Sequence, residues 1–341
     1  MISVIVTAYN RRSFLPLALE SLLGQTIDKS KFEVIVVSNF DVNLKPFLAM
    51  DIRAIKTDGS LGHFLDYALR VSKGEIISFL DDDDIYLPNK LEFVERTFGG
   101  SDRVVYYRNA IIIKGETEFD YDRILTENTR QYQHMVPNSR IISVSDFASA
   151  KDIFAIFQHG GALNLSSISI SRKCCEFLTR NLELNQMTIM PDLFFFLGIL
   201  YSAERNDVMV FGNNILSIYR IHSSTSRVSK TADMDQFVQQ MIKYCRLNIE
   251  NHHLLKEKMS KDSISYKYLG LAIQGWKAQL KIMTSRKCSL QEIADLVRIG
   301  IYKKDVDVLG SALLALLSWW VLRKKITFFF LRIMRRRQSY Y

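Results

Sequence analysis

The chain has 341 residues, of which 48% are hydrophobic and 24% are charged. This composition is that of an ordinary globular protein, and it excludes collagen-like, low-complexity and intrinsically disordered chains. The formal net charge is +9, but residues 323–341 contain seven basic residues and no acid, so they account for +7 and leave +2 for the rest. The body of the protein therefore lacks the basicity of a nucleic-acid-binding domain, and we expect no nucleic-acid partner.

The cysteines and the N-terminus bear on the cellular compartment of the protein. Cys174, Cys175, Cys245 and Cys288 lack the spacing of a zinc site or of a disulfide framework. We expect the neighbouring Cys174 and Cys175 to be buried thiols rather than redox partners, and a reducing, cytoplasmic setting fits best. Met1–Val4 leads directly into a strand pattern without a basic leader and cleavage site, so we expect no secretory signal peptide.

The first 110 residues alternate short apolar runs with segments of helical periodicity. Strands are predicted at four places: Ile2–Thr7, Phe32–Val37, Ile52–Lys56 and Glu75–Leu80. Helices are predicted at Phe14–Leu23 and Leu61–Val71. This alternation is typical of parallel βαβ units, in which ligands bind outside the carboxyl ends of the strands. Three of these ends carry polar residues: Thr7–Asn10, Ser38-Asn39 and Asp81–Asp84.

The remaining chain is less regular. A helix is predicted at Asn89–Phe98 and a strand at Arg103–Ile113, followed by a long polar loop at residues 114–140. A loop of this length inside a compact domain is often functional. Residues 141–220 indicate further sheet with a helix that begins at Pro191, and only helices are expected from about Asp233 onward.

The aspartate run Asp81–Asp84 follows a buried-strand pattern directly. Four adjacent carboxylates repel one another and destabilise the fold unless a cation neutralises them. Hard cations such as Mg²⁺ take oxygen ligands, usually one or two carboxylates together with substrate phosphates. The alternative is a solvated acidic turn, but the position at the end of a buried strand favours a metal site. A metal held by Asp83 against a diphosphate would stabilise a departing nucleoside diphosphate.

Two segments resemble a known family. Lys73–Leu91 (KGEIISFLDDDDIYLPNKL) resembles the part of family 2 glycosyltransferases that contains their Asp-x-Asp motif, and Val4–Arg11 (VIVTAYNR) resembles their first strand and donor-binding turn. The resemblance implies the GT-A fold, an α/β Rossmann-like nucleotide-diphospho-sugar transferase fold, and sugar transfer with inversion. It implies a catalytic domain at residues 1–230, with a donor-binding half (1–110) and an acceptor half (111–230). Residues 231–341 form a helical C-terminal extension.

The same resemblance implies donor contacts from Thr7, Ala8, Tyr9 and Arg11. Tyr9 offers an aromatic face and Arg11 a cationic fork suited to phosphate, while the simpler interpretations are a packed tyrosine and a surface arginine. Within the acidic run, Asp81 would hold the ribose or a metal-bound water, and Asp82 would occupy the variable position beside the donor. Asp83 would be the main ligand of Mg²⁺ or Mn²⁺, and Asp84 would lie nearest the sugar.

The sequence departs from the family pattern at two donor positions. Ser38-Asn39 stands where the family usually has an acidic residue that binds the base, and Leu65-Asp66 stands where it often has an Arg-Asn pair. Asn39 can both donate and accept hydrogen bonds, so Asn39 and Asp66 remain donor-binding candidates. The donor nucleotide, of UDP or GDP type, stays open.

An inverting transfer needs a carboxylate that accepts the proton of the attacking hydroxyl. The resemblance places this base at Asp192, about a hundred residues beyond the Asp-x-Asp motif. Pro191 suits the first helical position, so Asp192 falls in the first turn, where the helix dipole favours its ionised form. The family's preceding glutamate is absent, and the simpler interpretation is an ordinary helix-start aspartate.

Two further segments resemble the later part of the family's catalytic domain, and a Ser/Thr-rich stretch follows them. Gly160 and Gly161 would line the acceptor pocket, although a glycine pair more often marks a turn. His222, in Tyr219–His222, would complete the metal shell, with a structural histidine as the alternative. Ser223–Ser229 is predicted to be a loop that closes over bound donor.

The C-terminal residues combine an apolar segment with basic residues. Val308–Leu322 has about 15 uncharged residues, whereas a bilayer span needs roughly 20. Trp319-Trp320 and the basic residues beyond them are typical of a helix in the headgroup region of an anionic membrane. A buried helix with a solvated tail and a homodimer surface are the alternatives. Peripheral binding to the inner face of the cell membrane would suit a lipid-linked or glycan acceptor.

Two other functions are consistent with parts of the sequence. A nucleotidyltransferase also places carboxylates beside a nucleotide, but Thr7–Arg12 has no glycine of the kind found in loops that bind triphosphates. A catalytically degenerate scaffold that binds glycans or nucleotides would account for the missing glutamate before Asp192. A metal-dependent glycosyltransferase of polysaccharide biosynthesis is the leading prediction.

Overall fold

The computed structural model describes residues 1–115, 133–135, 140–156, 164–222, 234–284, 288–303, 308–309 and 312–313. The chain forms two compact units. The first comprises Met1–Asp146 and Ala162–His222, and the second comprises Phe147–Gly161 and Ser223–Tyr341. The domain boundaries predicted at residues 110 and 230 stay predictions.

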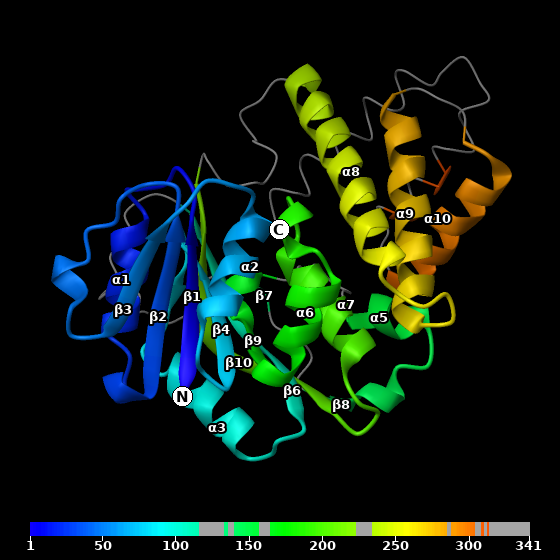
Figure 1. Ribbon diagram of the computed structural model, residues 1–341. Helices are drawn as coiled ribbons and strands as arrows, with labels where there is room; N and C mark the ends of the chain where they lie inside the picture. The colour runs from blue at the N-terminus through cyan, green and yellow to red at the C-terminus, as the bar shows by residue number, and fades with distance from the viewer. Residues whose placement is uncertain are drawn as a thin grey trace. The chain divides into compact units, whose positions relative to one another are not determined.

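The first unit is built on a sheet whose first part is parallel (Figure 1). Its strands are β1 (Ile2–Ala8), β2 (Phe32–Ser38), β3 (Asp51–Lys56) and β4 (Ile76–Asp81), in the order β3-β2-β1-β4. Helices α1 (Leu15–Leu23) and α2 (Leu61–Val71) connect them. The predicted parallel βαβ pattern is confirmed, and so is the α/β fold class.

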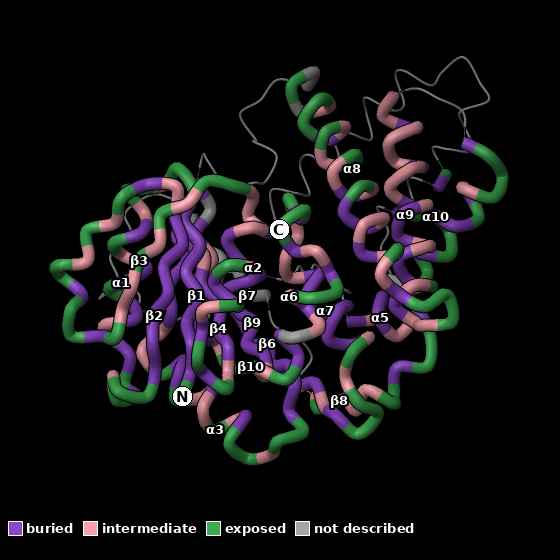
Figure 2. Tube along the Cα trace, in the orientation of Figure 1, coloured by how far each residue is buried: buried purple, intermediate pink, exposed green. Residues whose placement is uncertain are grey.

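The centre of this sheet is buried on both faces. Every residue of β1 and β2 is buried, whereas the outer strand β3 is partly exposed (Figure 2). Strands covered on both faces are continuously apolar rather than alternating, which explains why these two were recognisable as apolar runs. On one face, the core joins strand residues to α1 and α3 (Lys90–Gly99) through Val4, Val6, Leu19, Val94 and Phe98.

The second part of the sheet mixes strand directions. β9 (Ile168–Ser171) lies antiparallel between β4 and β6 (Val104–Gly115), and β10 (Val208–Ile221) runs parallel to β6. Two short strands, β7 (Gln133–Met135) and β8 (Arg140–Ser143), pair with β6 and β10. β5 (Ile85–Tyr86) pairs with β10 directly after the aspartates. The aspartate turn is therefore held between β4 and β5, beside the end of β10.

Helices α6 (Cys175–Asn181) and α7 (Pro191–Ser202) complete the first unit, and α2 packs tightly against the segment that leads to α7. The Gly62 backbone N–H donates to the Met187 carbonyl at 3.2 Å, and Ser60 Oγ donates to the Asn185 carbonyl at 2.8 Å. A Cβ added at Gly62 would lie 1.7 Å from the Leu184 carbonyl oxygen. This glycine allows the close approach that positions the start of α7.

Gly62→Ala is expected to destabilise the protein by about 2–3 kcal/mol, because the added methyl group overlaps backbone that cannot move aside. Urea unfolding measures this loss. Gly99→Ala is the matched control: no atom lies within 4 Å of its added Cβ, so stability should stay equal or rise. Equal stability of the two variants would contradict the packing described here.

The second unit is helical within the described residues. It contains α5 (Ala150–Ile156), α8 (Met234–Glu257), α9 (Ile264–Met283) and α10 (Leu290–Lys303). The rings of Tyr244 and Trp276 meet edge to face between α8 and α9. The helices predicted after about Asp233 are confirmed where the chain is described.

Several sequence predictions concern residues that the structure does not describe. The predicted loop Ser223–Ser229, most of the polar loop at 114–140, and the basic residues 323–341 lie outside the described residues. Their predicted roles stay predictions. Among the helices that are described, none combines the length and apolar character needed to cross a bilayer. All four cysteines are buried and free, which confirms the burial predicted for Cys174 and Cys175.

Candidate active site

The three polar strand ends lie side by side at the carboxyl edge of the sheet. In the strand register, Ala8 lies opposite Ser38, and Thr7 lies opposite Asp81. The aspartate turn meets the loop after β1 because the Asp82 backbone N–H donates to the Thr7 carbonyl at 3.2 Å. Parallel strands bring their carboxyl ends to one edge, so this grouping follows from the topology.

Asp82 links the aspartate turn to the donor loop. Its side chain is fully buried, and Arg11 Nη2 lies 2.9 Å from its Oδ1. Burial raises the pKa of Asp82 to about 8, while Arg11 acts in the opposite direction. Although Asp82 occupies the family's variable position, its carboxylate is a partner of Arg11 in this chain.

Asp83 meets a histidine from the far end of the unit. The two residues are 139 positions apart in the sequence, and His222 Nε2 lies 2.9 Å from Asp83 Oδ2. Arg11 Nη1 also ion-pairs with this oxygen. The His222 ring stacks on Phe14 with 4.1 Å between centroids, which fixes its orientation. The sequence prediction that Asp83 and His222 share a site is consistent with this placement, although their role as metal ligands stays a prediction.

Asp84 is enclosed by hydrogen-bond donors. Asn164 Nδ2 and Ser166 Oγ donate to its Oδ2 at 2.9 and 2.6 Å, and the Arg220 backbone N–H donates to its Oδ1 at 3.2 Å. Its side chain is fully buried. These contacts give Asp84 a part in holding the aspartate turn against β10. Its predicted place beside the sugar stays a prediction.

The residues present fit a hard divalent cation. Asp81, Asp83 and Asp84 each offer an oxygen, and these oxygens lie within 4.8 Å of one another. Two cis ligands of an octahedral Mg²⁺ lie about 3.0 Å apart when each bond is about 2.1 Å. The 2.9 Å between Asp83 Oδ2 and His222 Nε2 matches this spacing.

The charges of the cluster also fit a cation. Arg11 and Arg220 offset only two of the four carboxylates. Burial, followed by repulsion from Asp83, raises the pKa of Asp81 to about 8. Burial is the main cause of this rise in the pKa of Asp81, and repulsion between neighbouring carboxylates adds to it. A divalent cation would supply the missing charge.

Asp192 begins α7 beside this cluster. Pro191 occupies the first turn as predicted, and Asp192 Oδ1 accepts a hydrogen bond from the Leu193 backbone N–H at 2.9 Å. Its carboxylate is close enough to Asp81 to repel it electrostatically. Burial raises the pKa of Asp192 to about 6, opposed by Arg108. We expect the helix dipole to favour the ionised form, but burial outweighs this effect.

The residues predicted to contact the donor differ in their exposure to solvent and in their partners. The Tyr9 side chain is 52% exposed, with its ring 6.1 Å from that of Phe64, so one aromatic surface faces solvent. Thr7 and Ala8 are buried within β1. Asp66 forms an ion pair of 2.9 Å with Arg70 of the same helix. Neither residue takes part in the hydrogen bonds described above for the aspartate cluster. The donor contact of Asp66 stays a prediction.

Asn39 is tied to the β1 loop. The Asn10 backbone N–H donates to Asn39 Oδ1 at 3.0 Å, and Asn39 Nδ2 donates to Asn10 Oδ1 at 2.7 Å. Because a backbone N–H can only donate, the first bond fixes the orientation of the Asn39 amide. Gly160 and Gly161, predicted for the acceptor pocket, lie outside the described residues.

Sequence reasoning missed several residues that build the site. Phe14 stacks on His222 and lies 5.0 Å from the Arg220 guanidinium, and Ser166 links Asp84 to the Asp81 backbone N–H. Lys90 is fully buried and donates to Asn109 Oδ1 and, at 3.2 Å, to the Ser166 carbonyl. Lys90 lies within the segment Lys73–Leu91 that resembles the family, and Phe14 was marked only as the start of a predicted helix.

The fold and site together define an α/β protein with an acidic cluster and a histidine at the edge of a parallel sheet. Residues 3–154 match the family model of glycosyl transferase family 2. This match confirms, over residues 3–154, the resemblance to family 2 glycosyltransferases predicted from Val4–Arg11 and Lys73–Leu91.

Similar proteins are named glycosyltransferases. The chain is 37% identical over 99 residues to an uncharacterized glycosyltransferase of Haemophilus influenzae, covering 28% of this chain and 33% of that protein. It is 36% identical over 101 residues to the O-antigen biosynthesis glycosyltransferase WbnJ of Escherichia coli, covering 27% of this chain and 39% of that protein. The chain thus spans about a third of the length of these curated relatives.

Solved structures show a more distant similarity. The mannosyltransferase PcManGT of Pyrobaculum calidifontis in complex with GDP-Man and Mn²⁺ is 13% identical with a TM-score of 0.49, covering 99% of this chain and 86% of that one. S. aureus TarS 1–349 in complex with UDP-GlcNAc is 15% identical with a TM-score of 0.47, covering 99% and 92%. At this level the similarity says nothing about the ligands of this chain.

Proposed function

We propose that this protein is an inverting glycosyltransferase that transfers a sugar from a nucleoside-diphosphate sugar to a hydroxyl group, with Mg²⁺ or Mn²⁺ as cofactor. The observation that carries this proposal is the convergence of the aspartate turn, Arg11 and His222 at the carboxyl edge of the sheet. The family match over residues 3–154 supports a glycosyltransferase over a nucleotidyltransferase.

Several residues of the site would bind the donor. Asp83 and His222, with Asp81, would hold the cation, which when bound supplies Lewis-acid stabilisation of the departing diphosphate. Arg11 contributes a fixed positive charge for the diphosphate, and the exposed face of Tyr9 is available to stack on the base. Together these residues orient the donor sugar at the sheet edge.

Asp192 is the proposed general base. Its carboxylate takes the proton of the acceptor hydroxyl while that oxygen forms a bond to the anomeric carbon. The bond from the anomeric carbon to the diphosphate oxygen breaks on the opposite face, and the electron pair leaves with the nucleoside diphosphate. Attack opposite the leaving group inverts the configuration. With a pKa of about 6, Asp192 is mostly ionised near neutral pH, as a base must be.

We also propose a glycan or lipid-linked acceptor that the protein meets at a membrane surface. One relative is named for O-antigen biosynthesis, which fits a glycan acceptor. Leu290, Val297 and Ile301 are exposed on α10, at a spacing that places them on one helix face. Together with the basic residues 323–341, this face suits an anionic membrane. Co-sedimentation with anionic but not neutral vesicles tests the idea, and equal recovery with both would contradict it.

A thermal-shift screen tests the main proposal. Nucleoside diphosphates and their sugars are measured with and without Mn²⁺, because a ligand at 100 times its Kd stabilises the folded state by about 2.7 kcal/mol. We expect one nucleotide class to raise the Tm only when Mn²⁺ is present, and its sugar to release the nucleoside diphosphate slowly. Binding without any release would favour the scaffold alternative, and no shift with any nucleotide would contradict the proposal.

A further inference from the structure

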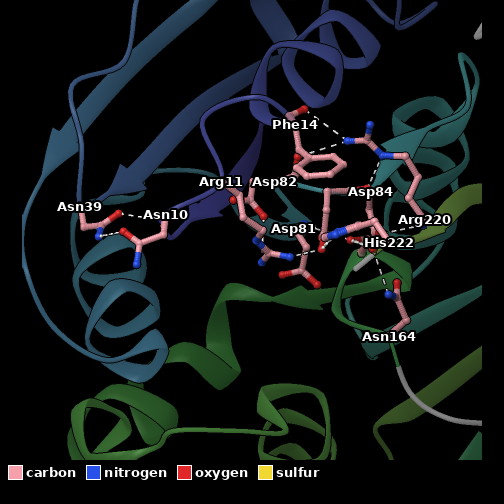
Figure 3. A network of polar contacts seen from close by, with 12 residues as sticks. Asn10, Arg11, Phe14, Asn39, Asp81, Asp82, Asp84, Asn164, Arg220 and His222 are labelled. Atoms are coloured by element: carbon pink, nitrogen blue, oxygen red, sulfur yellow. Dashed lines mark hydrogen bonds and ion pairs between the residues drawn. The ribbon is translucent and has the colours of Figure 1, made fainter. Parts of the chain in front are cut away.

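One positively charged side chain of the site, that of Arg11, belongs to a loop rather than to the sheet. Arg11 follows β1 and lies beside Asp82 (Figure 3). Its guanidinium ion-pairs with both Asp82 and Asp83. The Arg11 side chain is 26% exposed, whereas those of Asp82 and Asp83 are 0% and 7% exposed. Arg11 is therefore the most exposed of the three side chains.

Arg11 and His222 contact the same carboxylate oxygen of Asp83. Asp83 Oδ2 faces His222 Nε2 at 2.9 Å and also pairs with Arg11 Nη1. A divalent cation shared by Asp83 and His222 would need this oxygen. The guanidinium stays charged at any relevant pH, so it presents a permanent positive charge where the cation would bind. The two positive charges compete for one carboxylate oxygen.

The loop that carries Arg11 is fixed just before it. Asn10 adopts a left-handed backbone with φ of 58°, and two hydrogen bonds to Asn39 hold it there. Release of Asp83 by Arg11 therefore needs a rotation of a part-exposed side chain, which also changes its ion pair with Asp82, but no movement of the loop backbone. A diphosphate offers phosphate oxygens that match the guanidinium fork as well as a carboxylate does. It is thus a suitable new partner for Arg11.

We propose that Arg11 is an exchangeable internal counter-cation: without donor it neutralises Asp83, and the donor diphosphate draws it away, which frees Asp83 for the divalent cation. This inference rests on the proposed function and adds regulation of the same site. It makes the donor-free protein a weak binder of divalent cations. Nucleoside diphosphate and cation then strengthen each other's binding, by the same factor in both directions.

Mn²⁺ binding in the absence of nucleotide tests the exchange, because the direct contact between cation and diphosphate then plays no part. Free Mn²⁺ is measured by electron paramagnetic resonance for the wild type and for Arg11→Gln and Arg11→Ala. Removal of the competing charge should tighten Mn²⁺ binding by about tenfold, within the usual range of coupling between two sites. The strengthening of Mn²⁺ binding by nucleoside diphosphate should shrink at the same time.

Two controls separate exchange from a general change in charge. Arg12→Gln removes the same charge one residue further on, where the exposed guanidinium lies 5.0 Å from the Phe40 ring centroid. Arg11→Lys keeps a positive charge near Asp83. Both should bind Mn²⁺ close to the wild-type affinity. Thermal melting of each variant shows that it is folded before its Mn²⁺ affinity is compared.

The possible outcomes are distinct. Unchanged or weaker Mn²⁺ binding by Arg11→Gln and Arg11→Ala would overturn the exchange, and so would equal tightening by Arg12→Gln. In either case the wild type would still bind nucleoside diphosphate with Mn²⁺, and the proposed function would stand. A wild type that binds neither would instead contradict the proposed function itself.

Discussion

Asp83→Ala is expected to abolish Mn²⁺-dependent binding of the donor. The substitution removes the oxygen that faces both His222 and Arg11, and with it the charge that links the aspartate turn to the end of β10. Changes in residues that merely support metal ligands cost about 10–100-fold in affinity, so loss of a ligand should exceed about 100-fold. Titration with Mn²⁺ and the thermal shift with nucleoside diphosphate measure the loss.

Asp41→Ala is a matched control for Asp83→Ala. Asp41 follows β2 at the same edge of the sheet, but its side chain is 81% exposed and pairs with Lys56 at 2.8 Å. An exposed pair of this kind contributes little to stability or binding, so both readouts should match the wild type. A Mn²⁺-dependent thermal shift that survives in Asp83→Ala would remove this residue from the metal site.

The sequence predicted the first part of the fold well because its strands are buried on both faces. The apolar run Phe32–Val37 became β2 with one further residue, and the helix predicted at Leu61–Val71 has those bounds in the structure. β5 and β9 could not be predicted in the same way. β5 has two residues, and the antiparallel placement of β9 between β4 and β6 depends on contacts with distant segments.

The candidate site was predicted where a motif marks it and missed where only tertiary contacts do. The resemblance pointed to Asp83 and His222 although 139 residues separate them. Phe14 and Ser166 act through stacking and hydrogen bonds to partners that the sequence does not reveal. Arg11 was predicted for the diphosphate, and its ion pairs with the aspartates emerged only from the structure.

The pKa of Asp192 is another property that the sequence predicts only in part. The position in the first turn of a helix is visible in the sequence and favours a charged carboxylate by about 0.3–1 kcal/mol. Burial is visible only in the fold, and here it is the larger effect, so the pKa of Asp192 rises to about 6. The direction of a pKa shift therefore could not be derived from helix position alone.

Asp192→Asn is expected to lower sugar transfer by at least about 100-fold while donor binding stays nearly intact, because loss of a general base typically costs this much. The amide keeps an oxygen that can accept the Leu193 N–H bond of 2.9 Å, so the start of α7 should keep its geometry. Mn²⁺-dependent release of nucleoside diphosphate measures the reaction, and the thermal shift measures binding. Asp152→Asn, in the first turn of α5, is the control and should be fully active.

The pH dependence of the reaction gives Asp192 a second signature. Its pKa in the folded protein lies near 6, so the carboxylate is ionised above this pH and protonated below it. A base must be ionised to accept a proton, and the rate should therefore fall about tenfold for each unit of pH below 6. Asp192→Asn should lack this fall, because it has no carboxylate to titrate. Full activity of Asp192→Asn, or an unchanged acid limb in that variant, would show that another group accepts the proton.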